Sequence, residues 1–138
     1  MSVVNTKATT KSIGDFYENR AVDWIESEHL TVIARNYNVP KVGEIDIVAK
    51  CIDALANGRI RKTLVFIEVR ARKRGQFASS AESITTAKQH KIIHAAMHFL
   101  QEFDEFNEYD CRFDVIVFDY ADGEDARGEW IKAAFLAC

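Results

Sequence analysis

Hydrophobic and polar positions follow a helical period in two parts of the chain. Residues 13–29 place apolar side chains at helical spacing and predict a first helix, with Glu18 at the margin of its apolar stripe. A second, longer helix is predicted from Ser79, where Ser79 and Glu82 fit a capping box, to about Phe106. Trp24, Phe99 and Phe103 are expected in the core.

Strand-like alternation marks the remaining segments. Predicted strands cover 30–36, 44–49, 63–72 and 111–120. Asn57-Gly58 is a strong turn signal and predicts a hairpin between the second and third of them. The apolar segment 130–136 is compatible with a strand or a short helix. The order helix, three strands, helix, strand predicts an α/β sandwich in which a mixed sheet carries helices on its faces.

Length and composition narrow the class of protein. The chain has 138 residues, 48% hydrophobic and 28% charged, which predicts one globular domain over 1–138 with residues 1–11 flexible. The cysteines Cys51, Cys111 and Cys138 are far apart, so neither a disulfide framework nor a structural zinc site is expected. No apolar run is long enough to span a bilayer and no export signal is evident, so we expect a cytoplasmic protein.

Charge is unevenly distributed although the net charge is only -3. Residues 59–74 hold seven basic side chains and one acid, whereas residues 101–129 hold eleven acids and two basic side chains. This pattern favours one basic and one acidic face. The alternative is that both are ordinary solvated surfaces.

Two acids on neighbouring predicted strands are the strongest candidates for chemistry. If the strands form the predicted hairpin, Asp46 and Glu68 converge on one point, where a divalent cation would relieve their repulsion. The backbone carbonyl of Val69 is a further candidate ligand, and Arg70 points to the same side as Glu68. Glu18 could bind a second ion or orient water. The alternative is a structural ion-pair network of the two acids with Arg70 and Lys62.

A lysine in the second predicted helix occupies an unusual position. The helical wheel places Lys88 in the middle of the apolar stripe, between Ile84 and Ile92, with Lys91 one turn further on. Either lysine could serve the candidate site. The alternative is that their methylene stems cover the core while the ammonium groups reach water.

Several short motifs follow one another in a characteristic order. They are Gly14 and Glu18, Gly43-Glu44-Ile45-Asp46, Val65-Phe66-Ile67-Glu68-Val69-Arg70, Lys88, and Arg112-Phe113-Asp114-Val115. Together they resemble the YraN-type family of bacterial proteins over about residues 14–135. That family is similar to the PD-(D/E)xK nucleases and to archaeal-type Holliday junction resolvases. The resemblance implies a restriction-endonuclease-like α/β/α sandwich with a mixed central sheet.

The resemblance also implies roles for individual residues. The metal-binding acids correspond to Asp46 and Glu68, the basic third position to Arg70, and the acid of the first helix to Glu18. The superfamily usually has lysine where this chain has Arg70, and an arginine is always protonated and cannot act as a general base. Lys88 or Lys91 is therefore expected to supply the missing amine.

The leading hypothesis is a Mg²⁺- or Mn²⁺-dependent DNA endonuclease, with branched DNA as a candidate substrate. Asp46, Glu68, Arg70, Glu18 and Lys88 would form the site, and the DNA backbone would be contacted by Arg72, Lys73, Arg74 and Lys91. One alternative is a catalytically inactive nucleic-acid-binding module of the same fold. Another is an interaction protein whose acidic C-terminal third docks a basic partner.

Three further features have simpler expected roles. His90, His94 and His98 recur every four residues without an acidic or cysteine partner and are expected on the surface. Asp114 is expected to be structural. The apolar region Phe99–Phe106 offers a contact surface for a homodimer, which would let two DNA strands be cut in register.

Overall fold

The computed structural model describes residues 9–74 and 84–137, which form two helices, a 3-10 turn and five strands. Their bounds are α1 (Thr10–Ser27), β1 (Thr31–Val39), β2 (Gly43–Ala54), β3 (Ile60–Lys73), α2 (Thr86–Glu102), η2 (Asp104–Phe106), β4 (Asp110–Ala121) and β5 (Glu124–Phe135). All four predicted strands are confirmed, and the undecided C-terminal segment belongs to strand β5.

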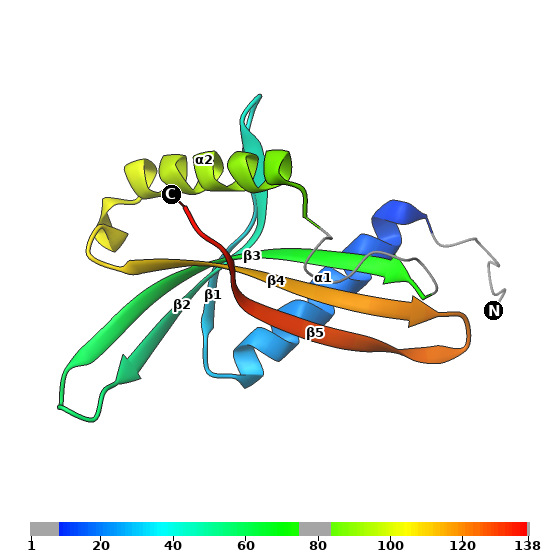
Figure 1. The fold of residues 1–138 in the computed structure, drawn as a ribbon, viewed down its shortest axis with the longest axis horizontal. Coiled ribbons are helices and arrows are strands. Elements are labelled where there is room, and N and C mark those ends of the chain that lie inside the picture. Colours follow the sequence, from blue (N-terminus) through cyan, green and yellow to red (C-terminus); the bar gives the residue numbers. More distant parts are fainter. Residues whose placement is uncertain (1–8, 75–83, 138) are drawn as a thin grey trace, which may run out of the picture.

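The five strands form one mixed sheet in the order β1-β2-β3-β4-β5. Only β3 and β4 are parallel, and the chain crosses between them through α2. The two helices lie on opposite faces of the sheet (Figure 1). This arrangement confirms the predicted α/β sandwich with a mixed sheet.

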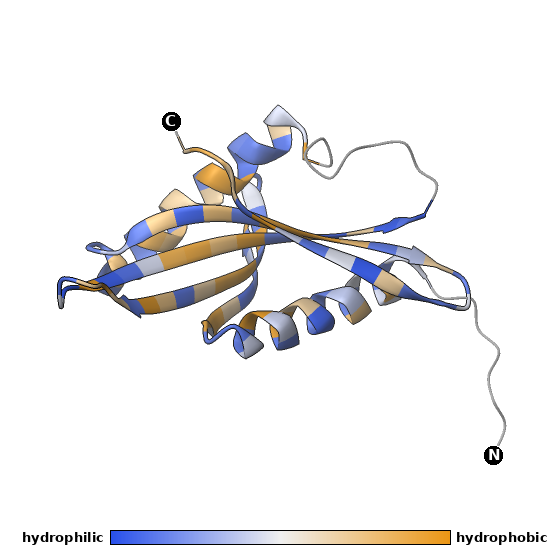
Figure 2. Cartoon of the chain, turned by 60° about the horizontal axis from the view of Figure 1, so that its bottom comes forward, coloured by the Kyte–Doolittle hydropathy of each residue, from blue (hydrophilic) through white to orange (hydrophobic). Residues whose placement is uncertain are grey.

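Each face of the sheet has its own hydrophobic core, because successive side chains of β3 point to opposite sides. Leu64 and Phe66 belong to the α2-side core, which is formed with Ile92, Ala95 and Phe99 of α2. Val65 and Ile67 belong instead to the α1-side core, together with Tyr17, Ala21 and Ile25 of α1. Alternate side chains of β3 therefore face α1 and α2, as the sequence predicts. Figure 2 shows that hydrophobic residues line the central strands.

Helix α1 begins three residues earlier than expected because Thr9 caps it. The Thr9 hydroxyl accepts a hydrogen bond from the Ser12 amide at 3.0 Å and so satisfies a donor of the first turn. The helix therefore includes Thr10 and Lys11, which fall within the segment 1–11 expected to be flexible. Residues 1–8 of that segment lie outside the described residues.

Helix α2 is shorter than predicted at both ends. Thr85 is its N-cap, with its hydroxyl accepting from the Lys88 amide at 3.1 Å, so the helix starts at Thr86 and not at Ser79. The expected capping box of Ser79 and Glu82 lies outside the described residues. The helix ends at Glu102, and Phe103 leads into η2.

The aromatic residues at the end of α2 are part of the protein's own core. Phe99 is 2% exposed and Phe106 is 9% exposed, and their rings stack on each other at 6.0 Å. The sequence-based suggestion that Phe99–Phe106 offers a dimer surface is therefore wrong for these two side chains. The homodimer itself stays a prediction. Neither described helix is long and apolar enough to cross a membrane.

Asp114 ties β5 to β4, which agrees with its expected structural role. Its buried carboxylate accepts hydrogen bonds from Nε and Nη2 of Arg112 at 2.8 and 2.9 Å. It also accepts from the indole N–H of Trp130 and from the backbone amide of Ala133, each at 2.9 Å. Ala133 has a left-handed φ of 51°, and the strand register shifts between Phe113 and Val115. The carboxylate thus holds an irregular stretch of β5 in place.

Candidate active site

Asp46 lies where strands β2 and β3 part. The described pairing between these strands ends at Ile47 and Ile67, one residue before Asp46 is reached. Ile45 packs in the α2-side core and Ile47 in the α1-side core, although residues two apart normally share a face, so β2 turns at Asp46. The Asp46 Oδ2 then accepts a hydrogen bond from the Val69 amide at 2.9 Å, which joins the separating strands.

Glu68, on β3, lies beside Asp46 of β2, and its side chain is buried, with 6% of the residue exposed. Burial raises the pKa of Glu68 to about 8, and repulsion from Asp46 adds to this rise. Burial also raises the pKa of Asp46, against the stabilising hydrogen bond from the Val69 amide. The predicted convergence of the two carboxylates is thus present, and together they favour a shared proton or a cation.

Lys88 reaches the carboxylate pair from α2. Its Nζ lies 3.8 Å from Oε1 of Glu68, and its charge lowers the pKa of Glu68 against the larger effect of burial. Its side chain remains 40% exposed, so the ammonium contacts both the acid and solvent. The sequence marked Lys88 through its position in an apolar stripe, and the structure places it at Glu68.

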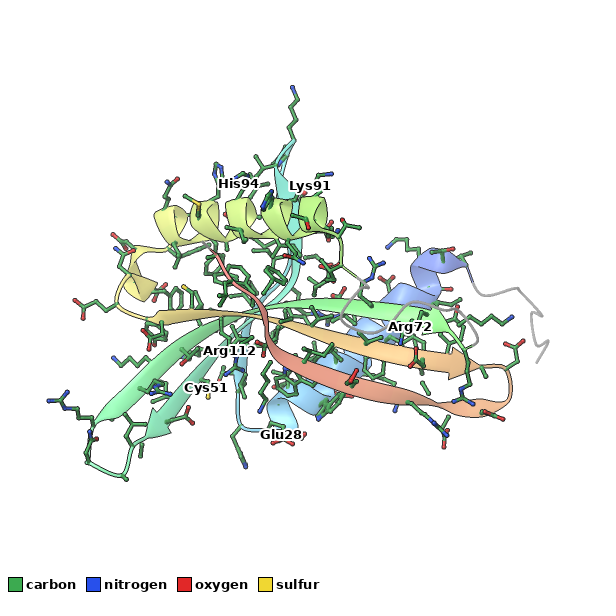
Figure 3. All side chains as sticks on the ribbon, viewed as in Figure 1. Glu28, Cys51, Arg72, Lys91, His94 and Arg112 are labelled. Atoms are coloured by element: carbon green, nitrogen blue, oxygen red, sulfur yellow. The ribbon has the colours of Figure 1, made fainter. Side chains whose placement is uncertain are left out.

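Lys91 has a different position. Its side chain is exposed beside the start of β2, where Lys91 lines a pocket with Gly43 and Glu44; Figure 3 labels it near His94 on α2. Its backbone lies against Gly43, where an added Cβ would come within 2.5 Å of the Lys91 carbonyl oxygen. Gly43 therefore permits close packing of β2 against α2. Of the two lysines, Lys88 is the one at the carboxylate pair.

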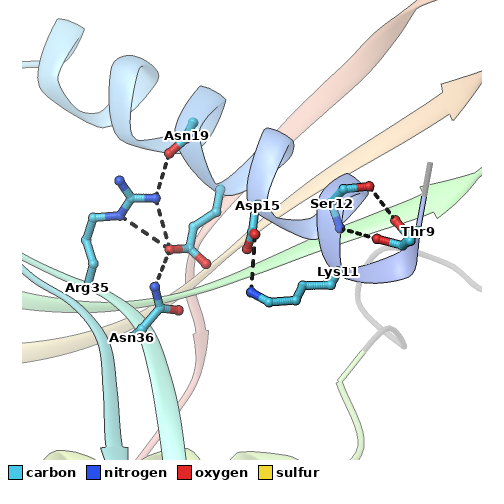
Figure 4. Close-up of polar contacts among 8 residues, drawn as sticks. Thr9, Lys11, Ser12, Asp15, Asn19, Arg35 and Asn36 are labelled. Carbon is cyan, nitrogen blue, oxygen red and sulfur yellow. Dashed lines mark hydrogen bonds and ion pairs between the residues drawn. The ribbon is translucent and has the colours of Figure 1, made fainter. Parts of the chain in front are cut away.

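Glu18 enters the same region from α1 and is 8% exposed. Its Oε1 accepts hydrogen bonds from Arg35 Nη2 at 3.1 Å, Arg35 Nε at 3.3 Å and Asn36 Nδ2 at 3.0 Å (Figure 4). The negative charge of Glu18 raises the pKa of Asp46, so the helix-borne acid acts on the carboxylate pair. Sequence reasoning missed Arg35 and Asn36, whose signal is two polar residues inside an otherwise apolar strand pattern.

Two charged residues at the rim complete the surroundings. Arg70 is exposed, its charge lowers the pKa of Glu68, and it makes no ion pair with any residue that the structure describes. Glu44 is exposed and its charge raises the pKa of Asp46. Arg70 therefore lies on the predicted side of Glu68 with its guanidinium open to solvent.

The basic residues at the end of β3 are paired with acids from the β4–β5 hairpin. The pairs are Arg72 with Asp119, Lys73 with Asp122 at 3.8 Å, and Arg74 with Glu124. The parallel pairing of β3 with β4 brings these segments together. The expected separation into a basic and an acidic face does not hold at this end of the sheet.

Among the described residues, the surroundings of Asp46 and Glu68 included, no three His, Cys, Asp or Glu side chains are grouped to hold a metal ion. His90, His94 and His98 are exposed on α2, as expected. A cavity of about 550 Å³ opens at the end of β3 opposite to Glu68, between Arg59 and Tyr109. The carboxylate pair is not part of its lining.

Comparison with known proteins places the chain in a family. Residues 17–118 match the model of the uncharacterised protein family UPF0102. A UPF0102 protein of Psychrobacter arcticus is 40% identical over 143 residues, covering 90% of this chain and 80% of the relative. The UPF0102 protein YraN of Escherichia coli O1:K1 is 41% identical over 128 residues, covering 92% of this chain and 86% of the relative. On these matches, the chain belongs to the UPF0102 family, which includes YraN.

Proposed function

We propose that this protein is a metal-dependent endonuclease that hydrolyses phosphodiester bonds in DNA. One observation carries the proposal: the half-buried carboxylate of Asp46 and the buried carboxylate of Glu68 converge beside the ammonium of Lys88. Burying like charges together is unfavourable unless a proton or a cation accompanies them. Buried titratable pairs with strongly shifted pKa values are typical of catalytic sites.

The residues present suit a hard divalent cation. Mg²⁺ prefers oxygen ligands and commonly uses one or two protein carboxylates together with water and substrate phosphate. Asp46 and Glu68 would supply the carboxylates. A residue in a strand directs its N–H and C=O to the same edge, and the Val69 amide already points to Asp46, so the Val69 carbonyl is the candidate third ligand.

A bound Mg²⁺ or Mn²⁺ would lower the pKa of a water ligand and neutralise phosphate charge. The protein's own side chains have separate tasks around it. Lys88 would hold Glu68 electrostatically, and its ammonium would orient a water molecule or a phosphate oxygen. Arg70 stabilises charge that develops on the phosphate. Glu18 orients water from the α1 side.

DNA contacts would extend from this site along the end of β3 and the start of α2. Arg72, Lys73, Arg74 and Lys91 are the candidates, and branched DNA in the cytoplasm is the candidate substrate. Since Arg72, Lys73 and Arg74 each meet an acid, a DNA phosphate would have to replace those carboxylates.

A cleavage assay tests the proposal. Branched, flapped and single-stranded DNA are incubated with wild-type protein in Mg²⁺ or Mn²⁺, and with Asp46→Ala and Glu68→Ala. We expect metal-dependent cleavage by the wild type and none by either variant. Asp53→Ala, at the far end of β2, is the matched control and should cleave normally. Retention of cleavage in both site variants would overturn the proposal.

The presence of Arg70 where related nucleases carry lysine favours one alternative function. A catalytically inactive DNA-binding module would bind DNA in a salt-sensitive manner, show no turnover in any divalent metal, and keep its affinity in Asp46→Ala and Glu68→Ala. Cleavage by the wild type rejects this alternative.

A further inference from the structure

Strand β1 has an unusual backbone conformation directly opposite Asp46. Arg35 pairs with Ile47 and Tyr37 pairs with Ile45, so the residue between them, Asn36, lies across from Asp46. Asn36 has a φ of 52°, in the left-handed region that asparagine tolerates better than most residues. Asn36 is the one residue of β1 with a positive φ, so this is a local feature of the strand, and the Asn36 side chain makes a specific interaction there.

That interaction is the contact of Asn36 with Glu18. The Asn36 amide and the guanidinium of Arg35 together donate three hydrogen bonds, all to Oε1 of Glu18 (Figure 4). Arg35 is in turn held by Oδ1 of Asn19, which accepts from Nη2 at 2.7 Å. Oε2 of Glu18 accepts no hydrogen bond from the residues for which the structure gives side chains.

The asymmetry of these contacts suggests a task for Glu18. Oε2 is not a buried atom that lacks a partner, so it keeps contact with solvent and can bind water while three donors hold Oε1. Here one oxygen is saturated and the other remains available, in a side chain that is 8% exposed and whose charge reaches Asp46. Such an arrangement fixes the direction of the free oxygen.

We propose that Asn36 and Arg35 are positioning residues that hold Glu18 through Oε1, so that Oε2 binds a water molecule or a hydrated cation beside Asp46 and Glu68. This inference rests on the proposed function, because it assigns Asn36 and Arg35 to the same metal site. Neither residue touches the metal or the substrate. They act by restricting Glu18, in the way that outer partners orient metal ligands and their water.

The test uses substitutions that keep the backbone conformation. Asn36→Gly removes the amide while glycine accepts the left-handed φ without strain. Asn38→Gly is the matched control, since Asn38 is an exposed asparagine two residues further along β1. Glu18→Gln and the double variant Glu18→Gln with Asn36→Gly complete the set. Mn²⁺ affinity is measured by calorimetry and DNA cleavage under single-turnover conditions at saturating Mn²⁺.

Outer partners of this kind typically contribute about 10–100-fold to metal affinity or activity. We therefore expect Asn36→Gly to lower the Mn²⁺ affinity and the cleavage rate within that range, with Asn38→Gly staying within about twofold of wild type. The double variant should be no worse than Glu18→Gln alone, because Asn36 acts through Glu18.

Two different results would overturn the inference, and they are distinguishable. If Glu18→Gln is impaired while Asn36→Gly binds Mn²⁺ and cleaves like Asn38→Gly, Asn36 has no positioning role and the proposed function stands. The same conclusion would follow if Asn36→Gly lowered only the melting temperature and left the Mn²⁺ affinity and the cleavage rate unchanged. If the wild type itself neither binds Mn²⁺ nor cleaves DNA, the proposed function fails and the inference falls with it.

Discussion

The ammonium of Lys88 lies 3.8 Å from Oε1 of Glu68. This ion pair connects α2 to β3 at the point where the pairing of β2 with β3 ends. Two residues after this acid, the strand carries Arg70. Helix α2 thus offers a primary amine to the carboxylate of Glu68. Arg70 carries a permanent positive charge, whereas a lysine amine can lose its proton, so the two basic groups are not chemically equivalent.

Replacing Lys88 by methionine should separate its role from that of the fold. Methionine keeps much of the apolar stem and removes the ammonium, so the protein should remain folded. We expect DNA cleavage to fall by about 10²-fold or more, as for loss of a positioned charged group. Single-turnover kinetics measure this effect. Lys132→Met, at an exposed lysine of β5, is the control and should cleave within about twofold of wild type; equal losses in the two variants would contradict the assignment.

Glu68 should make the metal-free protein less stable as the pH rises. Its pKa is raised from 4.5 to about 8 in the folded state, so between these values the folded protein binds more protons than the unfolded chain. The free energy of unfolding therefore falls with rising pH across this window, by at most about 1.4 kcal/mol per pH unit. Below pH 4.5 both states hold the proton and the effect disappears.

Glu68→Gln removes this titration and tests the sign. In the presence of a chelator, the variant should melt at a higher temperature than wild type at pH 8, with the difference shrinking toward pH 4.5. Thermal denaturation followed by circular dichroism at several pH values measures it. A difference in melting temperature that is constant with pH, or that grows toward acid, would show that Glu68 is not a buried acid with a raised pKa.

The acids of the β4–β5 hairpin should weaken DNA binding. Asp119→Asn, Asp122→Asn and Glu124→Gln together remove the carboxylates that face Arg72, Lys73 and Arg74. We expect tighter DNA binding and a steeper salt dependence. The slope of the logarithm of the binding constant against the logarithm of the salt concentration should change by about -0.9 for each further phosphate contact. Fluorescence anisotropy at several salt concentrations measures both. An unchanged slope would mean that these basic residues do not contact phosphate.

Asp114 should be needed for stability and not for metal binding. Asp114→Ala leaves the Arg112 guanidinium, the Trp130 indole N–H and the Ala133 amide without their acceptor. Removing one partner of a buried ion pair typically costs about 3–5 kcal/mol. Urea denaturation should show a loss of that size. A loss below about 1 kcal/mol would mean that water or another side chain replaces the carboxylate.

Local patterns were sufficient to predict the carboxylate pair. Strand alternation placed Glu68 on one face of β3, and the Asn57-Gly58 turn predicted the hairpin that brings Asp46 beside it. Lys88 was marked as a charge inside an apolar helical stripe. These features depend on contacts between neighbouring elements, whose geometry follows from periodicity.

Other features depend on packing between distant segments. The contact of Asn36 and Arg35 with Glu18 needs both a left-handed residue in β1 and the docking of α1 on that strand, and periodicity encodes neither. The acids beside Arg72 and Arg74 become neighbours only through the parallel pairing of β3 and β4. Helix α2 starts at the cap residue Thr85, whose hydroxyl accepts from the Lys88 amide, a contact that residue periodicity does not encode.

Calorimetric titration with Mn²⁺ is the most direct test of the central claim that Asp46 and Glu68 form a metal site. Wild type, Asp46→Ala, Glu68→Ala and the control Asp53→Ala are titrated at pH 8, with and without DNA. We predict that wild type and Asp53→Ala bind Mn²⁺ and that neither site variant does. Absence of binding by the wild type even with DNA present, or equal binding by all four proteins, would contradict the account.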